Sequence, residues 1–407
     1  MKPLDIGFAR ALTIALKHAD PIGTETLSVM DSAGMICAEK VAAKVDAPSL
    51  DASLRDGYAV ASDDIANAGP ISPVELEISG NAVAGEDRIR RLPFGKTIRV
   101  LTGATVPKGA DLILEEEVVK QKNGRIQVFS GARAGKNILV KGSDVARGEI
   151  LATSGQEMSP GRIGFLVAGG ISRLRVFKRP KIGLLAIGSE LFQPGKSLPR
   201  GKLYASNVAL QHAWCKSMGF ETDVQIAEDS PSAISARVKK MLAGTDLLIT
   251  SGGAWKGDRD FVIKVFTDLG WKLLFHRVRM LPGKAIGMGI IGRKPIFCLS
   301  GGPTANEIAF MMIALPFIHR MAGVKKSTHL YLDAKLEKTI KGARDWTQFV
   351  HCRVIRSDSE TFLRPINLKS RLSSIASAQT IIQIPEGIEE IPAGSVVSSI
   401  RLDRLLG

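Results

Sequence analysis

Cysteine and aromatic residues are scarce in this sequence of 407 residues. It contains four cysteines, and aromatic residues make up 5% of it. Cys37, Cys215, Cys298 and Cys352 have neither metal-ligand nor redox spacing, which argues against a disulfide framework and favours a reducing compartment. We expect each of them to be a small core residue.

Long apolar runs are also absent. The first twenty residues, MKPLDIGFARALTIALKHAD, have Asp5, Arg10 and Lys17 among their apolar side chains, so they predict an amphipathic helix rather than a secretory signal. No stretch is long enough to span a bilayer. We therefore expect a cytoplasmic protein without a membrane partner.

Basic residues outnumber acidic ones. There are 55 lysines and arginines against 40 acidic residues, a formal net charge of +15, which raises the question of nucleic-acid binding. The basic residues are scattered in ones and twos, and no RNA-binding motif or basic stripe interleaved with aromatic residues is present. We therefore expect an anionic small substrate, such as a phosphate ester or an oxyanion, rather than a nucleic acid.

Apolar strands, glycine-rich loops and amphipathic helices alternate in the second half of the chain. Four such units begin with KIGLLAIG, ETDVQIAED, DLLIT and PIFCLSGG. Ser230 and Pro231 suit the cap and the first position of one of the helices. Successive strand-helix units predict a mostly parallel sheet covered on both faces, and such sheets bind ligands at the carboxyl ends of their strands.

The remaining segments have a different pattern. Residues 70–140 carry short alternating runs and turn signals, which predict a separate β-rich insertion flanked by helices. Beyond about residue 325 the chain again favours strands, so we expect a small C-terminal β domain. A chain of this length is too long for a single core and divides into several domains.

The stretch TSGGAWKGDRDF directly follows the apolar run DLLIT. Gly252, Gly253 and Gly257 let the backbone approach a ligand, and the helix that follows offers free N–H groups to a phosphate. A tight structural turn capped by Asp258 explains the pattern equally well. If a phosphate binds, Asp258 and Asp260 require a bridging cation, and Mg²⁺ suits that role.

Other strand-to-helix loops carry similar residues. The long loop LAIGSELFQPGKSLPRGKLYASN places Glu190 after a strand, and it places Ser206 and Asn207 where they could cap the next helix. LSGGPTAN repeats the bend of small residues, and LPGKAIGMG supplies Lys284. Each residue alone also fits a solvated or structural role. Together they predict one ligand-binding edge of the sheet.

Taken in order, these segments resemble the molybdopterin molybdenumtransferase (MoeA-like) family, which includes the related domain of gephyrin. The matching segments are SLRDGYAV, IRVLTGATVPKGAD, NILVKGSDVARGEIL, IGSEL with PGKSL and GKLYASN, SGGAWKGDRDF, PGKAIGMG and LSGGPTANEIAF. They span nearly the whole chain and keep the family's order and approximate spacing.

The resemblance implies a multidomain α/β fold. Its parts are a segmented N-terminal helical domain (1–45 and 141–177), a β-rich insertion domain (46–140), a molybdopterin-binding three-layer domain with a parallel sheet (178–324) and a C-terminal β-barrel domain (325–407). It also implies a homodimer. The family binds adenylylated molybdopterin, cleaves the adenylate with the help of a divalent metal, and passes molybdate onto the dithiolene. We accordingly expect a Mg²⁺-dependent transferase that meets an apo-molybdoenzyme or other proteins of the cofactor pathway.

The resemblance also implies site residues, carried over motif by motif. The expected catalytic residues are Asp56, Asp144, Glu190, Asp260 and Lys284. The residues expected to bind the pterin and its phosphate are Thr102, Ser206, Ser251, Gly252, Gly253, Gly283, Gly301 and Pro303. The expected metal ligands are Glu190, Asp229 and Asp260. Lys284 would face the anionic charge of molybdate or pyrophosphate, and Asp56 and Thr102 would reach in from the partner subunit.

Several residues depart from the family's usual motifs TGDEL, KPGK and LPGNP and from an aspartate in the YASN segment. They are Ser189, Leu281, Ser300, Gly302 and Ala205, and Trp255 and Lys256 are added in the glycine-rich loop. These changes make the pocket less acidic. They leave two alternatives to a molybdenum insertase: a non-catalytic molybdopterin-binding or delivery paralogue, and an insertase selective for tungstate.

Overall fold

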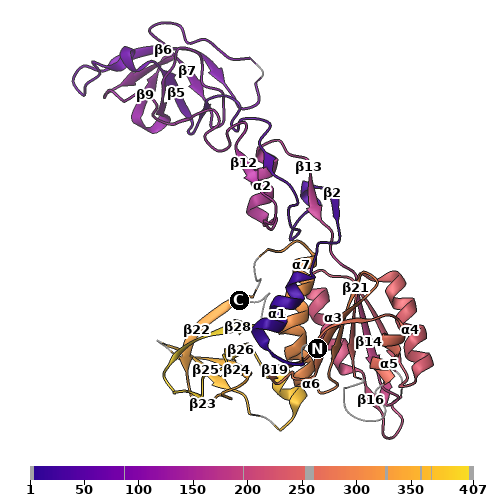
Figure 1. Cartoon of the computed structure of the whole chain (residues 1–407). Coiled ribbons are helices and arrows are strands. Elements are labelled where there is room, and N and C mark those ends of the chain that lie inside the picture. Colours follow the sequence, from indigo (N-terminus) through magenta and orange to yellow (C-terminus); the bar gives the residue numbers. More distant parts are fainter. Residues whose placement is uncertain are drawn as a thin grey trace. The chain divides into compact units, whose positions relative to one another are not determined.

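The chain folds into two compact units (Figure 1). The computed structural model describes residues 4–86, 88–195, 197–252, 261–325, 329–357, 360–367 and 369–402. Unit 1 comprises Met1–Thr24 and Phe177–Gly407, and unit 2 comprises Glu25–Val176. No helix among the described residues is long and apolar enough to cross a membrane. The division into four domains with the boundaries given above stays a prediction.

A sheet covered by helices on both faces lies at the centre of unit 1. Its parallel part has the strand order β17, β14, β18, β21, with the bounds Thr222–Ala227, Ile182–Ile187, Leu247–Ser251 and Lys294–Leu299. All neighbours in this part run parallel, which confirms the predicted sheet. The antiparallel strands β20 (Ile286–Ile291) and β19 (Lys272–Leu281) continue the sheet, and β1 (Leu4–Gly7) pairs with β19 in parallel.

The antiparallel hairpin was not predicted, because β20 is rich in glycine and its sequence favours turns. The structure explains one of these glycines. A Cβ on Gly289 would lie 2.2 Å from the indole nitrogen of Trp271, so glycine is needed for this ring to cover the strand. Close packing therefore overrides the weak strand propensity of IGMGII.

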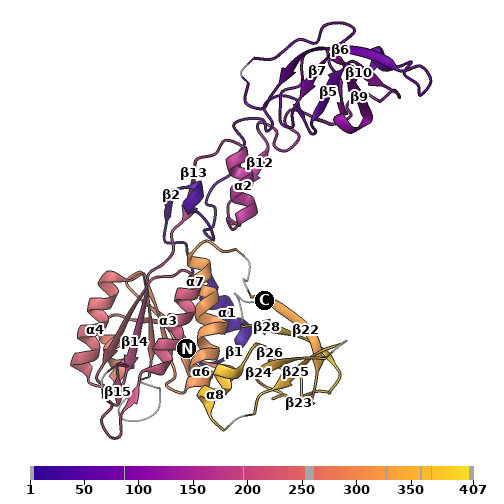
Figure 2. The same cartoon turned by 180° about the vertical axis from the view of Figure 1, so that it is seen from behind.

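Side chains of the parallel strands alternate between two cores. In β14, Leu184 and Ala186 enter the cluster beneath α1, α3, α6 and α7, whereas Leu185 and Ile187 enter the cluster beneath α4 and α5. Figure 2 shows α3 and α4 on either side of the sheet. These helices are α1 (Phe8–Lys17), α3 (Ser206–Ser217), α4 (Pro231–Gly244), α5 (Phe261–Asp268), α6 (Pro303–Ala309) and α7 (Leu315–Met321). The continuous apolar runs of the strands follow from burial on both faces.

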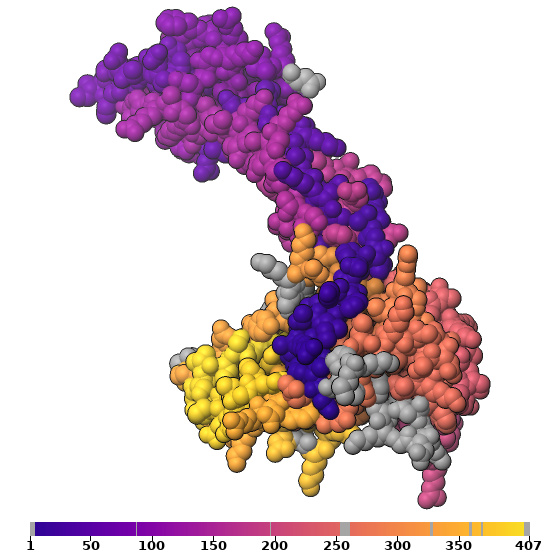
Figure 3. All heavy atoms as spheres, viewed as in Figure 1, coloured from indigo at the N-terminus to yellow at the C-terminus, as the bar shows by residue number. Residues whose placement is uncertain are grey.

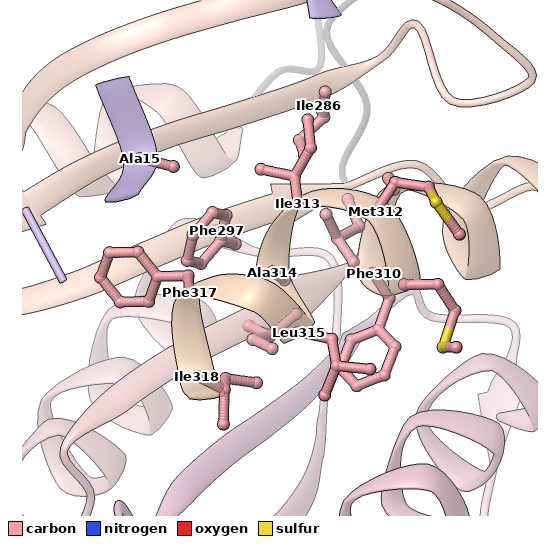
Figure 4. Packing of buried hydrophobic residues seen from close by; sticks show 14 of the residues in the cluster. Ala15, Ile286, Phe297, Phe310, Met312, Ile313, Ala314, Leu315, Phe317 and Ile318 are labelled. Carbon is pink, nitrogen blue, oxygen red and sulfur yellow. The ribbon is translucent and has the colours of Figure 1, made fainter. Parts of the chain in front are cut away.

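The larger of the two cores gathers around a short π-helical segment, Phe310–Ala314, that joins α6 to α7. Figure 4 shows this segment with Phe297 of β21 and Phe317 of α7. The rings of Phe297 and Phe317 meet edge to face, with centroids 5.1 Å apart. All five residues of the π-helical segment are buried, so the helix pair is anchored on the sheet.

The C-terminal strands close into a barrel, as predicted. Pairings run from β24 to β25, β22, β28, β26 and back to β24, with the bounds Thr347–Arg356, Thr361–Pro365, Tyr331–Leu336, Val396–Arg401 and Thr380–Ile384. The barrel is completed by α8 (Arg371–Ser377) and by the short pair β23 (Ile340–Lys341) and β27 (Glu390–Ile391). Each of these five strands is therefore paired on both sides.

Several contacts fix the barrel to the rest of unit 1, among them the pairing of β19 with β24 and two side-chain contacts. The rings of Phe8 in α1 and Phe349 in β24 meet edge to face at 5.3 Å, and Figure 3 shows the indigo N-terminal segment of this unit lying beside the yellow barrel. His351 of β24 forms a hydrogen bond of 2.9 Å between its Nε2 and Glu307 Oε2 of α6. Both side chains of this pair are buried. The barrel is therefore held through α1 and α6.

Unit 2 contains the predicted β-rich insertion. Its main sheet has the order β8, β5, β7, β6, β10, β9, with the bounds Leu112–Glu115, Gly57–Val60, Lys96–Val100, Val74–Ala82, Arg125–Val128 and Val119–Lys122. Short pairs surround α2 (Pro160–Ala168): they are β2 (Thr24–Ser28) with β13 (Arg173–Phe177), β3 (Val41–Ala42) with β12 (Ile150–Ala152), and β4 (Ala52–Ser53) with β11 (Ile138–Leu139). The four cysteines form no disulfide bonds with one another, and all are buried, as expected for small core residues.

The N-terminus of α4 provides a test of the local fold. Ser230 accepts a hydrogen bond of 3.4 Å from the N–H of Ala233, and Pro231 opens the helix, as predicted. We expect Ser230→Ala to lower the free energy of unfolding by about 1 kcal/mol. Ser232→Ala, at an exposed position of the same turn, should change it by less than about 0.5 kcal/mol. Urea unfolding measures both; equal losses would contradict the capping role.

Candidate functional site

The loops at one edge of the sheet of unit 1 bring most of the predicted site residues together. Gly188, Asp229, Gly252 and Ser300 lie in the segments that directly follow the parallel strands β14, β17, β18 and β21. Since β19 runs parallel to β21 across the hairpin, the turn carrying Lys284 lies at the same edge. This is the edge at which sheets of this kind bind their ligands.

A network of amide groups surrounds Ser251 at the end of β18. Asn207 of α3 and Asn306 of α6 each donate an Nδ2–H to Ser251 Oγ at 3.0 Å. Asn207 also donates to the carbonyl of Gly301 at 3.0 Å, and Asn306 donates to the carbonyl of Ser300 at 2.7 Å. Gln211 donates to Asn306 Oδ1 at 2.6 Å. Ser251 Oγ thus accepts twice and donates to no other described residue, so its hydrogen can be donated to a ligand.

Asn306 and Gln211 were not predicted as site residues, although Asn306 lies in the matching segment LSGGPTANEIAF. The prediction that Ser206 and Asn207 cap α3 was wrong. The cap position is Ala205, and Asn207 instead reaches the end of β18 and the loop after β21. An asparagine in the first turn of a helix reads as a capping residue in sequence, whereas here tertiary contacts take its amide.

Glycine is required where the loops after β18 and β21 meet. Gly252 has a φ of 96°, and a Cβ there would lie 2.3 Å from the carbonyl oxygen of Ile187. Its N–H donates to the carbonyl of Leu299 at 3.2 Å. A Cβ on Gly301 would contact the Cα of Gly252 at 3.8 Å. The two backbones therefore approach each other closely, and a side chain at position 252 would separate them.

The helices α3 and α6 begin at this edge without side-chain caps. Ala205 and Gly302 occupy their cap positions, and neither supplies a side-chain acceptor. Pro303 opens α6 and has no N–H of its own. The first-turn N–H groups, together with the positive end of the helix dipole, suit an anion. Ser300 Oγ nearby is buried and has no hydrogen-bond partner among the described residues.

Two of the predicted metal ligands lie on neighbouring loops. Glu190 is exposed, and a Cβ on Gly188 would lie 2.6 Å from its carboxylate, so glycine gives this carboxylate room. Ser189 Oγ accepts the N–H of Asp229 at 3.2 Å and ties the two loops together. Asp229 Oδ1 is buried without a hydrogen-bond partner in the described part of the chain. Such an orphaned carboxylate oxygen fits a cation ligand.

The third predicted metal ligand, Asp260, lies outside the described residues, as does Gly253. Within the described ranges, no group of three histidine, cysteine or acidic side chains could hold a metal ion. The metal site composed of Glu190, Asp229 and Asp260 therefore stays a prediction.

A pocket of about 390 Å³ lies beside the Glu190 loop. Its lining includes Ser189, Phe192, Lys202, Glu228 and Arg237. Lys202 donates to the carbonyl of Ser189 at 2.9 Å, and Arg237 donates to Gln225 Oε1 at 2.9 Å. Two cations and an aromatic ring thus flank the acidic loops.

The turn between β19 and β20 presents Lys284. Gly283 has a φ of 114°, which glycine adopts without strain. The carbonyl of Lys284 accepts the N–H groups of Val278 and Ile286 at 3.1 and 3.0 Å, so the backbone of the turn is fixed. Lys284 Nζ lies 4.6 Å from the centre of the Trp346 ring. None of the described carboxylates forms an ion pair with it.

In unit 2, the structure brings two of the three predicted residues together. Asp56 Oδ1 accepts the N–H of Thr102 at 2.6 Å and its hydroxyl at 2.7 Å. The hydrogen bond from the Thr102 N–H has the larger effect and that from its hydroxyl the smaller, and both lower the pKa of Asp56 below its usual value. Asp144 is exposed, and no described hydrogen bond joins it to this pair. Its loop is instead fixed by Asp46, which accepts the N–H of Arg147 at 2.8 Å.

Two family models together match most of the chain. The model of the MoeA N-terminal region (domain I and II) matches residues 6–170, and the model of a probable molybdopterin binding domain matches residues 183–320. The chain belongs to the MoeA family. The second match covers every loop of the edge described above and all but the first residue of the parallel strands.

Relatives and solved structures of this family cover nearly the full length. The chain is 26% identical to the molybdopterin molybdenumtransferase of Staphylococcus epidermidis over 98% of this chain and 96% of that protein. It is 29% identical to the molybdopterin molybdenumtransferase of Bacillus subtilis over 92% of this chain and 89% of that protein. The crystal structure of the MoeA protein of Pyrococcus horikoshii matches with a TM-score of 0.84 and 26% identity, covering 98% of this chain and all of that one (100%).

The requirement for glycine at position 252 can be tested. Gly252→Ala places a Cβ against the carbonyl of Ile187 at a positive φ, so we expect a loss of about 1–3 kcal/mol in the free energy of unfolding. Gly244→Ala is the matched control, because no atom lies within 4 Å of a Cβ at this last residue of α4. The control should be neutral or slightly stabilising. Thermal unfolding compares the two; equal melting temperatures would show that the turn tolerates a side chain.

The hydrogen bonds of Asp56 can be tested by titration. Thr102→Val removes the hydroxyl but keeps the backbone N–H, so the pKa of Asp56 should rise only part of the way to its usual value. Thr102→Ser keeps both donors and should leave this pKa unchanged. NMR detection of the carboxylate carbon measures each value. A valine variant with the wild-type pKa would mean that the hydroxyl does not bind Asp56 in solution.

Proposed function

We propose that this chain inserts molybdenum into adenylylated molybdopterin, acting as a molybdopterin molybdenumtransferase in molybdenum cofactor biosynthesis. The observation that carries the proposal is the hydrogen-bonded network around Ser251 at the edge of the sheet. There a free hydroxyl hydrogen and two uncapped helix N-termini converge, in a chain of the MoeA family. Relatives that match over nearly the full length bear the name molybdopterin molybdenumtransferase.

The anionic end of the substrate is expected at the helix starts. Backbone N–H groups without side-chain partners bind a phosphate without a counter-charge from lysine or arginine. Ser251 donates its remaining hydrogen, and Gly252 and Gly301 keep the approach free of side chains. The asparagines 207 and 306 orient the serine hydroxyl, so they are positioning residues.

The acidic loops are expected at the adenylate end. Glu190 and Asp229 would hold Mg²⁺ together with Asp260, and the ion would offset the negative charge of the phosphate anhydride. Lys202 and Arg237 in the adjacent pocket suit the nucleotide phosphate. Lys284 would bind molybdate, because its ammonium group has no described carboxylate partner.

We further propose that a homodimer forms the complete site and that Asp56 and Thr102 come from the partner subunit. Their hydrogen bonds keep the Asp56 carboxylate ionised and oriented, as a role in binding or catalysis requires. A cytoplasmic location fits a soluble biosynthetic enzyme.

The departures from the family's usual motifs bear on the two alternatives, a binding or delivery protein and an insertase selective for tungstate. Ser189 retains an acceptor for the N–H of Asp229, so the loss of an acidic residue here leaves the loop connection intact. Ala205 and Gly302 instead remove potential acceptors from the helix starts and leave more N–H groups for the ligand. The first change favours retained catalysis, and the second favours tight anion binding, including that of tungstate.

Anaerobic incubation of the purified protein with adenylylated molybdopterin, Mg²⁺ and molybdate tests the proposal. We expect AMP release coupled to activation of an apo-molybdoenzyme, and a parallel arm with tungstate determines the preferred oxyanion. Tight binding without AMP release would overturn the proposal in favour of a delivery protein.

The same assay tests the metal ligands. Glu190→Gln should raise the Mg²⁺ concentration needed for half-maximal AMP release by about tenfold, since a neutral amide is a weaker ligand for Mg²⁺. Glu221→Gln is the matched control, because Glu221 precedes β17 and lies at the opposite edge of the sheet. An unchanged Mg²⁺ requirement in Glu190→Gln would remove Glu190 from the metal site.

A further inference from the structure

Trp346 lies at the ligand-binding edge, although it belongs to the C-terminal part of the chain and to none of the segments that match the family's motifs. Its ring centre is 4.6 Å from Lys284 Nζ. At this distance the ammonium group is attracted to the negative face of the indole ring. The contact joins the residue before the barrel strand β24 to the turn between β19 and β20.

The backbone on both sides of this contact is fixed. Trp346 directly precedes β24, whose first residues pair with the last residues of β19, Met280 with Thr347 and Leu281 with Gln348. The N–H of Trp346 donates to the carbonyl of Ala343 at 2.8 Å. Arg279 Nε donates to the carbonyl of Asp345 at 3.2 Å. The backbone that carries the indole ring is therefore held beside the turn that carries Lys284.

A ring and a carboxylate would hold Lys284 with different consequences. A carboxylate partner would neutralise the ammonium group and repel an incoming oxyanion. An aromatic ring orders the long side chain but carries no net charge, so the positive charge remains available. Lys284 is half-buried and has no ion pair with a described carboxylate, which is the arrangement that an anion-binding lysine requires.

We propose that Trp346 is a positioning residue, whose ring holds the Lys284 ammonium group at the edge of the sheet as an uncompensated charge for the oxyanion substrate. This inference rests on the proposed function for the identity of the anion, molybdate. It assigns the C-terminal barrel a part in substrate capture, because the barrel supplies the ring.

A double-mutant cycle tests the proposal. Trp346→Leu should weaken molybdate binding about fivefold, because a contact of this kind contributes about 1 kcal/mol. Trp346→Phe keeps an aromatic face and should lose less. In a Lys284→Met background, Trp346→Leu should have no further effect, since the ring acts through the lysine. Calorimetry gives the Kd of molybdate for all variants, and KM for molybdate should rise while kcat changes little.

The outcomes separate the possible roles of the ring. The same loss from Trp346→Leu with and without Lys284 would overturn the proposal, because the ring would then act independently of the lysine. Equal losses in the leucine and phenylalanine variants would overturn it too. Phe129→Leu is the control, since it removes the contact of Lys120 with an aromatic ring in unit 2, where the centroid distance is 5.2 Å. This control should bind molybdate as the wild type does.

A spectroscopic measurement keeps this inference distinct from the proposed function. Lys284→Met should change the fluorescence of Trp346, seen as a difference between Trp346-containing and Trp346→Phe proteins, whether or not the chain is an insertase. A fluorescence change with no AMP release from the wild type would leave the contact in place and overturn the proposed function. AMP release without coupling between the two residues would overturn the role of Trp346 alone.

Discussion

The site of unit 1 depends on two asparagine amides that meet on one serine hydroxyl. Asn207 lies in α3 and Asn306 lies in α6, and these helices are far apart in the chain. Ser251 is the last residue of β18. Each amide also holds a carbonyl of the loop after β21. The network thereby places the first turns of α3 and α6 beside the end of β18. It also orients the uncapped N–H groups of these turns. Without it, the carbonyl groups of Ser300 and Gly301 would lose these two side-chain donors.

The glycines and the amides act together at this edge. Gly252 adopts a positive φ so that its loop can turn beside Ile187, and Gly301 packs its backbone on the same turn. Small residues allow the close approach, while the buried amides give it a single geometry. The edge is therefore polar and held in a defined geometry, as a site for a charged ligand must be.

The architecture could be predicted from sequence because the relevant signals are local. Apolar strands, a helix cap at Ser230 and turns of small residues each determine their own element, and the parallel sheet and its ligand-binding edge follow from them. The hairpin of β19 and β20 could not be predicted, because Gly289 is selected by the Trp271 ring rather than by strand propensity. Similarly, nothing near Asn306 in sequence reveals that its amide reaches Ser251, and Trp346 lies more than fifty residues from Lys284.

The buried pair of Glu307 and His351 places a constraint on how this family can be recombined. Glu307 directly follows Asn306, so the residue that holds the barrel is the neighbour of a residue that orders the edge of the sheet. Removing one member of a buried hydrogen-bonded pair leaves the other without a partner at considerable cost. A chimera that exchanged the barrel with that of a distant relative would need to carry α6 with it. The barrel and α6 therefore form one structural unit, although strands and loops separate them in the chain.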